Sequence, residues 1–199
     1  MAWKEHFKTL AQRLAAHEPS LYPAEELDEL DDIRIGKLSV EGFSEGEKPF
    51  ALAVKSALHL FNESLDASHE LSQELHTPEG SLLHGIMHRM EGDYPNAQYW
   101  LRLAGRHPFS EALGSRMQAY LQEQDLTRVG SPALRKKLEA MASQRAYDPF
   151  TLTEAVEQQV TRSRDEGAEA HLKHLQWLEL RGLLDYCYVR SGGEGGLFA

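Results

Sequence analysis

Three prolines in this sequence each follow a residue whose side chain can cap a helix, and this feature constrains the fold most. The pairs are Thr77-Pro78, Ser131-Pro132 and Asp148-Pro149. A Thr, Ser or Asp side chain accepts a hydrogen bond from the first helical turn, and proline fits there because its missing N–H would have no partner. Runs that alternate with β-branched residues, typical of strands, are almost absent. The sequence therefore predicts an all-α protein.

Apolar periodicity extends this prediction to about ten helices in a single globular domain. The length of 199 residues suffices for one full hydrophobic core, whereas two domains would each be small. The expected helices cover residues 2–16, 23–31, 49–62, 65–76, 78–91, 95–104, 110–123, 131–144, 149–162 and 166–189. We expect an N-terminal helical arm (1–35), a loop (36–48), the main helical body (49–191) and a flexible glycine-rich tail (192–199).

Charge and composition exclude several classes of function. The net charge of −10 repels the phosphate backbone of nucleic acids, and the basic run Arg135-Lys136-Lys137 is short. No stretch approaches the roughly 20 apolar residues that cross a bilayer, and the first residues lack the apolar run of a signal peptide. Cys187 is the only cysteine, so no intramolecular disulfide forms. We therefore expect a cytoplasmic protein that binds neither nucleic acid nor a membrane.

The strongest candidate for chemistry lies on the predicted helix 78–91. His84, His88 and Glu91 occupy positions i, i+4 and i+7, which places them within a stripe about 60° wide on one helix face. Two imidazoles and a carboxylate in this arrangement suit a divalent transition metal such as zinc, iron or manganese. His69 on the preceding helix is a further candidate ligand. The same histidines can instead be structural, with each ring hydrogen-bonded to a backbone carbonyl or an acid.

The residues around this stripe are polar and aromatic, as in a small-molecule binding pocket. Either histidine of the stripe can act as a catalytic acid or base, oriented by Glu91 or by Asp93. Arg89 or Arg102 can hold an anionic ligand through paired N–H groups. The other predicted ligand-binding residues are Asn96, Tyr99, Trp100 and His107. The prediction is a polar pocket for a small anionic molecule or a divalent metal ion.

Two resemblances involve these residues. Residues 85–104 resemble one tetratricopeptide helical hairpin, in which small residues such as Gly85 and Ala97 let two helices cross closely. A wider set of segments resembles an uncharacterised family of bacteria and fungi: Leu65-Asp66-Ala67-Ser68-His69, His84-Gly85-Ile86-Met87-His88-Arg89-Met90-Glu91-Gly92-Asp93-Tyr94, Asn96-Ala97-Gln98-Tyr99-Trp100 and His107-Pro108. That family has no established activity, so the resemblance assigns no catalytic residues.

Other interpretations stay open. Helical hairpins also form non-enzymatic protein-interaction modules, which would present an exposed concave surface and no enclosed pocket. The last predicted helix carries apolar residues on several sides from Leu172 to Leu184, so it is either a homodimer contact or a helix buried all round. The sequence contains no phosphate-binding glycine loop and no dinucleotide fingerprint. The sequence therefore leaves open whether the chain is an enzyme.

Overall fold

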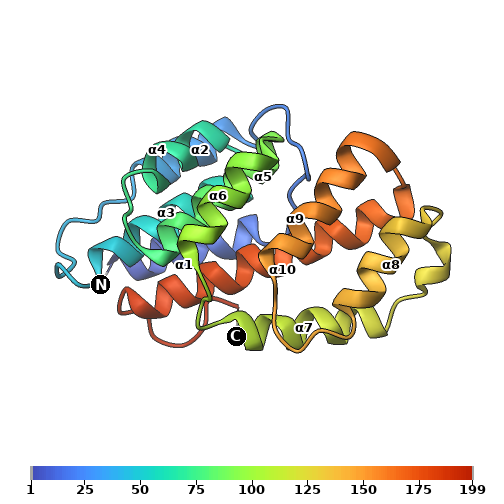
Figure 1. Ribbon diagram of the computed structural model, residues 1–199. Coiled ribbons are helices and arrows are strands. Elements are labelled where there is room, and N and C mark those ends of the chain that lie inside the picture. Colours follow the sequence, from blue (N-terminus) through green and yellow to red (C-terminus); the bar gives the residue numbers. More distant parts are fainter. Residues whose placement is uncertain (1, 199) are drawn as a thin grey trace.

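Figure 1 shows the computed structural model, which describes the backbone of residues 2–198 and the side chains of residues 6–198. Within residues 2–198 the chain forms ten α-helices and no strand, so the all-α prediction is confirmed. The helices are α1 (Ala2–Leu14), α2 (Glu29–Gly36), α3 (Lys48–Phe61), α4 (Leu65–Ser72), α5 (Pro78–Glu91), α6 (Tyr94–Ala104), α7 (Ser110–Gln122), α8 (Pro132–Met141), α9 (Pro149–Gln158) and α10 (Glu166–Arg190). A 3₁₀ turn (Leu126–Arg128) precedes α8, and a π-helical turn (Gln159–Ser163) continues α9.

The three helix starts that the prolines marked are capped as predicted. Thr77 accepts a hydrogen bond from the backbone N–H of Gly80 at the start of α5, over 3.1 Å. The side chains of Ser131 and Asp148 do the same at the starts of α8 and α9. Because these bonds lie within one turn of sequence, they can be predicted from local residue types alone.

The predicted helix 23–31 is wrong, because residues 17–28 are irregular and α2 begins only at Glu29. The Asp28 side chain caps α2 by accepting from the backbone N–H of Asp31. One residue earlier, the backbone N–H of Leu27 donates to the carbonyl oxygen of Asn62 (2.8 Å), so it is not available to a helix. The local Asp28 cap marks the start of α2, and this long-range hydrogen bond keeps the preceding segment out of the helix.

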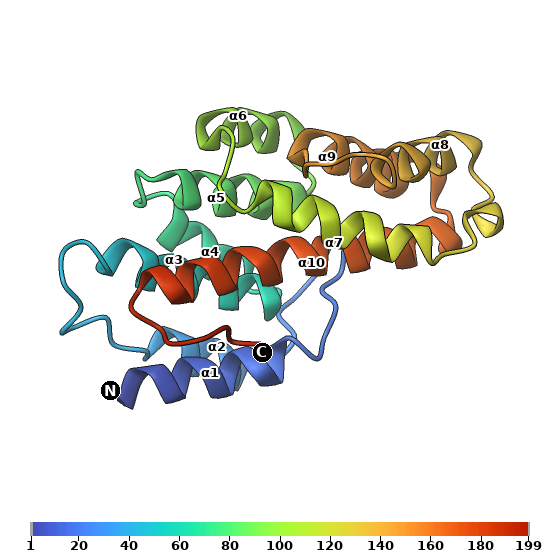
Figure 2. The ribbon, with the colours of Figure 1, turned by 90° about the horizontal axis from the view of Figure 1, so that it is seen from below.

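α10 runs through the middle of the molecule, and the other helices pack around it. In Figure 2, α1 and α2 lie on one side of α10, and α6, α8 and α9 lie on the other. The leucines of α10 that face the core are Leu172, Leu175, Leu180, Leu183 and Leu184, all of them buried within the chain. α10 is therefore a central core helix. No helix in the described part of the chain is long and apolar enough to cross a membrane.

Both ends of the described chain pack against this body. Phe7 of α1 is buried, and the indole N–H of Trp177 donates to the carbonyl oxygen of Ala15 over 2.9 Å. The glycine-rich tail, which we expected to be flexible, folds back along α10, where the backbone N–H of Leu197 donates to Oδ1 of Asp185 at 2.7 Å. The predicted arm and tail are thus parts of the same packed structure.

Three neighbouring helices, α4, α5 and α6, position the candidate site. α5 contacts both of the others. α5 and α6 form a hairpin whose turn uses Gly92 at a φ of +88°, a left-handed conformation that glycine adopts without strain. Gly85 permits their close crossing, because a Cβ atom there would lie 2.8 Å from the side chain of Leu101. The hairpin therefore has the close helix crossing that its small residues predicted.

Candidate functional site

The two histidines of α5 are buried between α4 and α6. His84 is 3% exposed and His88 is 6% exposed, whereas His69 on α4 is half-buried. The ring centroid of His69 lies 4.8 Å from that of His84 and 5.5 Å from that of His88. One ring nitrogen from each of the three histidines lies within 4.8 Å of the others. We call this set, His69, His84 and His88, the three-histidine cluster.

His84 is the member of the cluster whose hydrogen bonding is incomplete. Neither of its ring nitrogens has a hydrogen-bond partner among the described residues, although the side chain is buried. Its ring stacks on the indole of Trp100 in α6, with centroids 4.0 Å apart and planes 15° from parallel. A buried imidazole without partners is unusual, because burying an unpaired polar group costs free energy.

The charge state of His84 suits a metal ligand. Burial, with smaller contributions from His88 and His69, lowers the pKa of His84 to about 4. The ring is therefore neutral at pH 7, and a neutral imidazole carries one nitrogen lone pair that a cation can accept.

His88 is oriented by two neighbours. Its Nδ1 lies 2.5 Å from Oε1 of Glu91, and the amide nitrogen of Asn96 lies 3.0 Å from its Nε2 and 3.4 Å from its Nδ1. The carboxylate on Nδ1 fixes the tautomer, as in carboxylate–histidine–metal arrangements, and Nε2 then accepts a hydrogen bond from the Asn96 amide. A metal ion at Nε2 would replace this amide. Glu91, predicted as a metal ligand, therefore lies behind His88 and outside the three-histidine cluster.

Asp93 and two of the predicted ligand-binding residues are exposed and are not members of the three-histidine cluster. Asp93 is exposed and caps α6 by accepting from the backbone N–H of Asn96 (3.2 Å). It does lie near Glu91, with which it forms a second group of potential ligand atoms around His88. Tyr99 is 54% exposed. Arg102 is exposed on α6 and donates to Oε1 of Gln98.

Arg89 has a different environment from the one that we predicted for an anion clamp. It is fully buried, and its guanidinium group forms an ion pair with Glu179 of α10, which is also fully buried. Nε and Nη2 of Arg89 donate to Gln176, and the hydroxyl of Tyr147 donates to Glu179. Burial raises the pKa of Glu179 against the lowering effect of Arg89. We call these four residues the Arg89 network.

His107 lies in a separate buried pair, away from the three-histidine cluster. Its Nε2 is 3.2 Å from Oε1 of Glu79 at the start of α5, and its ring packs against Tyr186 and Phe109. Burial alone would raise the pKa of Glu79, but hydrogen bonds from His107 and from the backbone outweigh it and lower that pKa. This pair joins α5 to the start of α7 and to α10.

The histidines of α10 also lie outside the cluster. Nδ1 of His171 is 3.0 Å from the hydroxyl of Tyr120, and Nδ1 of His174 is 2.6 Å from Oε1 of Glu18. Burial lowers the pKa of His171, and His174 adds to this effect. His171 therefore joins α10 to α7, and His174 joins α10 to the segment that follows α1.

One local sequence resembles a hydrolase motif. Residues 42–46 read Gly-Phe-Ser-Glu-Gly, which matches the Gly-x-Ser-x-Gly pattern of a nucleophile elbow. The motif needs a strand before the serine, but residues 42–46 follow a non-helical loop in a described chain without strands. The hydroxyl of Ser44 donates to Oε2 of Glu47 at 2.6 Å, which orders the start of α3. This serine therefore belongs to the loop and turn that lead into α3.

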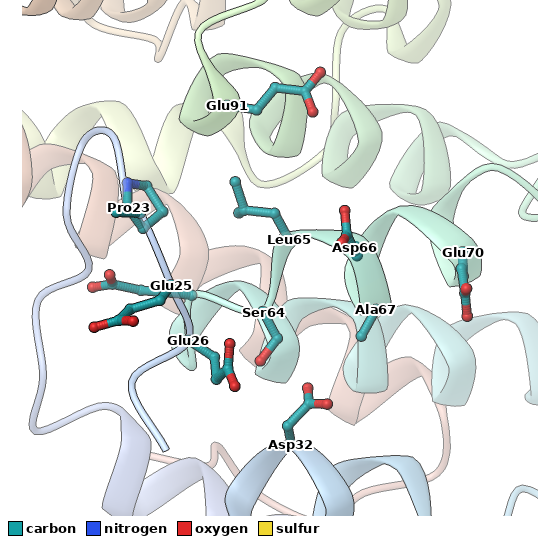
Figure 3. Close-up of a pocket in the computed structure, with 12 residues that line it drawn as sticks. Pro23, Glu25, Glu26, Asp32, Ser64, Leu65, Asp66, Ala67, Glu70 and Glu91 are labelled. Atoms are coloured by element: carbon teal, nitrogen blue, oxygen red, sulfur yellow. The ribbon is translucent and has the colours of Figure 1, made fainter. Parts of the chain in front are cut away.

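An open hollow of about 530 Å³ lies beside the cluster, between α4, the end of α5 and the irregular segment before α2 (Figure 3). Its lining includes seven carboxylate residues and no lysine, arginine or histidine among the described residues. The acids are Glu25, Glu26, Asp32, Glu63, Asp66, Glu70 and Glu91. We call this hollow the acidic basin. Three of these acids, Glu25, Glu26 and Asp32, lie in one acidic run of the sequence, whereas the fold brings the other four to them from α4, the turn before it and α5.

Comparison with known proteins assigns no family to the chain: no family model, no curated protein and no solved structure matches it. The functional argument therefore depends on the geometry of this molecule.

Proposed function

We propose that this protein binds a divalent transition metal ion through the three-histidine cluster. The observation that carries the proposal is His84, a buried and neutral imidazole with no hydrogen-bond partner among the described residues. Leaving such a group unpaired costs about 1–3 kcal/mol, and a bound metal ion would supply the missing partner.

The spacing of the nitrogens is compatible with coordination. Zinc–nitrogen bonds are about 2.0–2.1 Å, so two imidazole nitrogens on one tetrahedral zinc lie roughly 3.4 Å apart. The cluster nitrogens lie within 4.8 Å of one another, so they must approach by about an ångström or less per side chain. His69 is half-buried on the short helix α4, where a small rotation of its ring can supply this movement.

The ligand types narrow the choice of metal. Imidazole nitrogens suit zinc, iron, copper or nickel, whereas manganese prefers sites with more carboxylate oxygens. Three protein ligands also leave a fourth position for water or a substrate, which is the arrangement of catalytic zinc sites. Glu91 would support such a site by holding His88 through Nδ1 (2.5 Å).

A metal ion is better supported than the small anion that we also considered. The guanidinium group of Arg89 is already paired with Glu179, and that of Arg102 lies on the outer face of α6. The basin next to the cluster is lined by carboxylates, which repel anions and attract cations.

Titration of the purified, tag-free protein with Co²⁺ tests this function. After removal of metal with a chelator, we expect about one equivalent of Co²⁺ to bind and to produce visible absorption bands of nitrogen-coordinated Co²⁺. We also expect tryptophan emission to fall, because Trp100 stacks on His84. His84→Phe should abolish binding, because phenylalanine keeps the stacking on Trp100 but has no lone pair. His76→Ala is the matched control, since His76 is an exposed histidine close to the same helix; it should bind like the parent protein.

Two outcomes would overturn the proposal. The first is the failure of Co²⁺, Zn²⁺, Ni²⁺, Cu²⁺ and Fe²⁺ to bind to a correctly folded parent protein. The second is binding that His84→Phe leaves unchanged. Either result would favour the non-enzymatic interaction module with structural histidines.

A further inference from the structure

The acidic basin and the three-histidine cluster share walls. Glu91 lines the basin, and its Oε1 lies 2.5 Å from Nδ1 of His88. α4 contributes Asp66 and Glu70 to the basin and His69 to the cluster. Figure 3 shows Glu91 on α5 across the basin from these two acids of α4. A cation that enters the basin is therefore next to the cluster.

The charge of the basin is only partly neutralised. Three of its acids have histidine partners, because Asp32 contacts His59 (2.8 Å), Glu63 contacts His17 (2.7 Å) and Glu91 contacts His88 (2.5 Å). Its other acids include Glu26, which is exposed. Neither Glu26 nor Glu25, Asp66 or Glu70 forms an ion pair with any other described residue. Several unpaired carboxylates in one concave surface concentrate the negative potential there.

We infer that the acidic basin captures hydrated divalent cations and raises the rate at which they reach the three-histidine cluster. This inference depends on the proposed function, because the cation binds finally to the unpaired His84, and the basin contributes only the electrostatic field that attracts it. A recess with one sign of charge raises the local concentration of counter-ions and their association rate by 10-fold or more, to an extent that falls steeply with salt. The dissociation rate depends on the histidine ligands, so the basin should leave it unchanged.

Stopped-flow measurement of Co²⁺ association, followed by the fall in tryptophan emission, tests the inference. The basin variant is Glu26→Gln/Asp66→Asn/Glu70→Gln, which removes three negative charges without touching a cluster histidine or Glu91. The matched control is Glu123→Gln/Glu139→Gln/Glu166→Gln. These three acids are exposed and lie at the end of α7, on α8 and at the start of α10, the end of the molecule away from α4 in Figure 1.

In low salt, about 10 mM, we expect the association rate constant of the basin variant to fall about fivefold to tenfold, whereas the control falls less than twofold. The difference should disappear near 1 M salt, where the screening length is about 3 Å. Equal rates for the basin variant and the parent protein, or equal decreases in both triple variants, would overturn the inference while metal binding stands. Absence of Co²⁺ binding to the parent protein would overturn the proposed function itself.

Discussion

α5 contains two adjacent buried residues, His88 and Arg89, that belong to two different polar groups of side chains. The two groups differ in whether all of their buried polar atoms have hydrogen-bond partners. In the Arg89 network, the guanidinium group donates to the amide oxygen of Gln176 and to the carboxylate of Glu179, which also accepts from the Tyr147 hydroxyl. In the three-histidine cluster, His84 has neither nitrogen paired within the described residues. We call a buried polar network closed when its polar groups have partners within the protein, and open when one of them does not. An open network can therefore bind a ligand from outside the chain.

This comparison assigns different tasks to two sides of one helix. The Arg89 network joins α5 to α10 and stabilises the fold. Breaking its ion pair would leave an uncompensated charge in the core, which lowers the free energy of unfolding. The cluster joins α5 to α4 and leaves a neutral lone pair in a buried position. Mutations on the two sides should therefore affect different properties, stability on one side and metal binding on the other.

The largest effect should come from Arg89→Met, which leaves the carboxylate of Glu179 buried without its cation. We expect the free energy of unfolding, measured by urea denaturation, to fall by about 3–5 kcal/mol. The double variant Arg89→Met/Glu179→Met should recover most of this loss, because both charges are then removed. A change of less than 1 kcal/mol in the single variant would contradict the contrast between closed and open networks.

Tyr147→Phe should have the next largest effect, because it removes one donor from the same buried carboxylate of Glu179. Hydrogen bonds to charged groups contribute about 1.5–3 kcal/mol, so we expect a loss of that size in the free energy of unfolding. Tyr99→Phe is the control, since Tyr99 is largely exposed and should change stability by about 0.5 kcal/mol or less. Equal effects of the two substitutions would refute a structural role for the Tyr147 hydroxyl.

Gly85→Ala tests whether the α5–α6 crossing supports the cluster. The new Cβ atom would lie 2.8 Å from the side chain of Leu101 and 3.2 Å from the carbonyl oxygen of Ala97. We expect thermal and urea denaturation to show a loss of about 1–3 kcal/mol, with weaker Co²⁺ binding because α6 carries Trp100. Gly182→Ala on α10 is the control: its Cβ would make ordinary contacts, the nearest at 3.5 Å, and should be neutral or slightly stabilising.

The smallest effect on stability should come from His84→Phe in the presence of a chelator. Phenylalanine removes two unpaired buried nitrogens and can keep the stacking on Trp100, so we expect a change of about 1 kcal/mol or less. Chemical denaturation of both proteins in chelator measures it. A loss above about 2 kcal/mol would indicate that His84 has a structural partner, and the contrast with Arg89 would fail.

The sequence predicted the parts of this protein that depend on local chemistry. Thr77, Ser131 and Asp148 cap the helices that their following prolines begin, because a capping bond joins residues two or three positions apart. The close crossing of α5 and α6 at Gly85 was also predictable, since residue size at one position controls how near two helices can approach. The positions of His84 and His88 on one face of α5 follow from the helical repeat in the same way.

Only the tertiary structure decided which of these side chains share an environment. α4 brings His69 to the cluster, while Glu91 turns to Nδ1 of His88 and Arg89 is matched by Glu179, ninety positions later in the chain. The segment before α2 is kept out of the helix in the same way, by a hydrogen bond from Leu27 to Asn62. Sequence patterns encode helix faces and caps through neighbouring residues, but the partners of a buried polar group depend on how distant helices pack, and no local pattern records that.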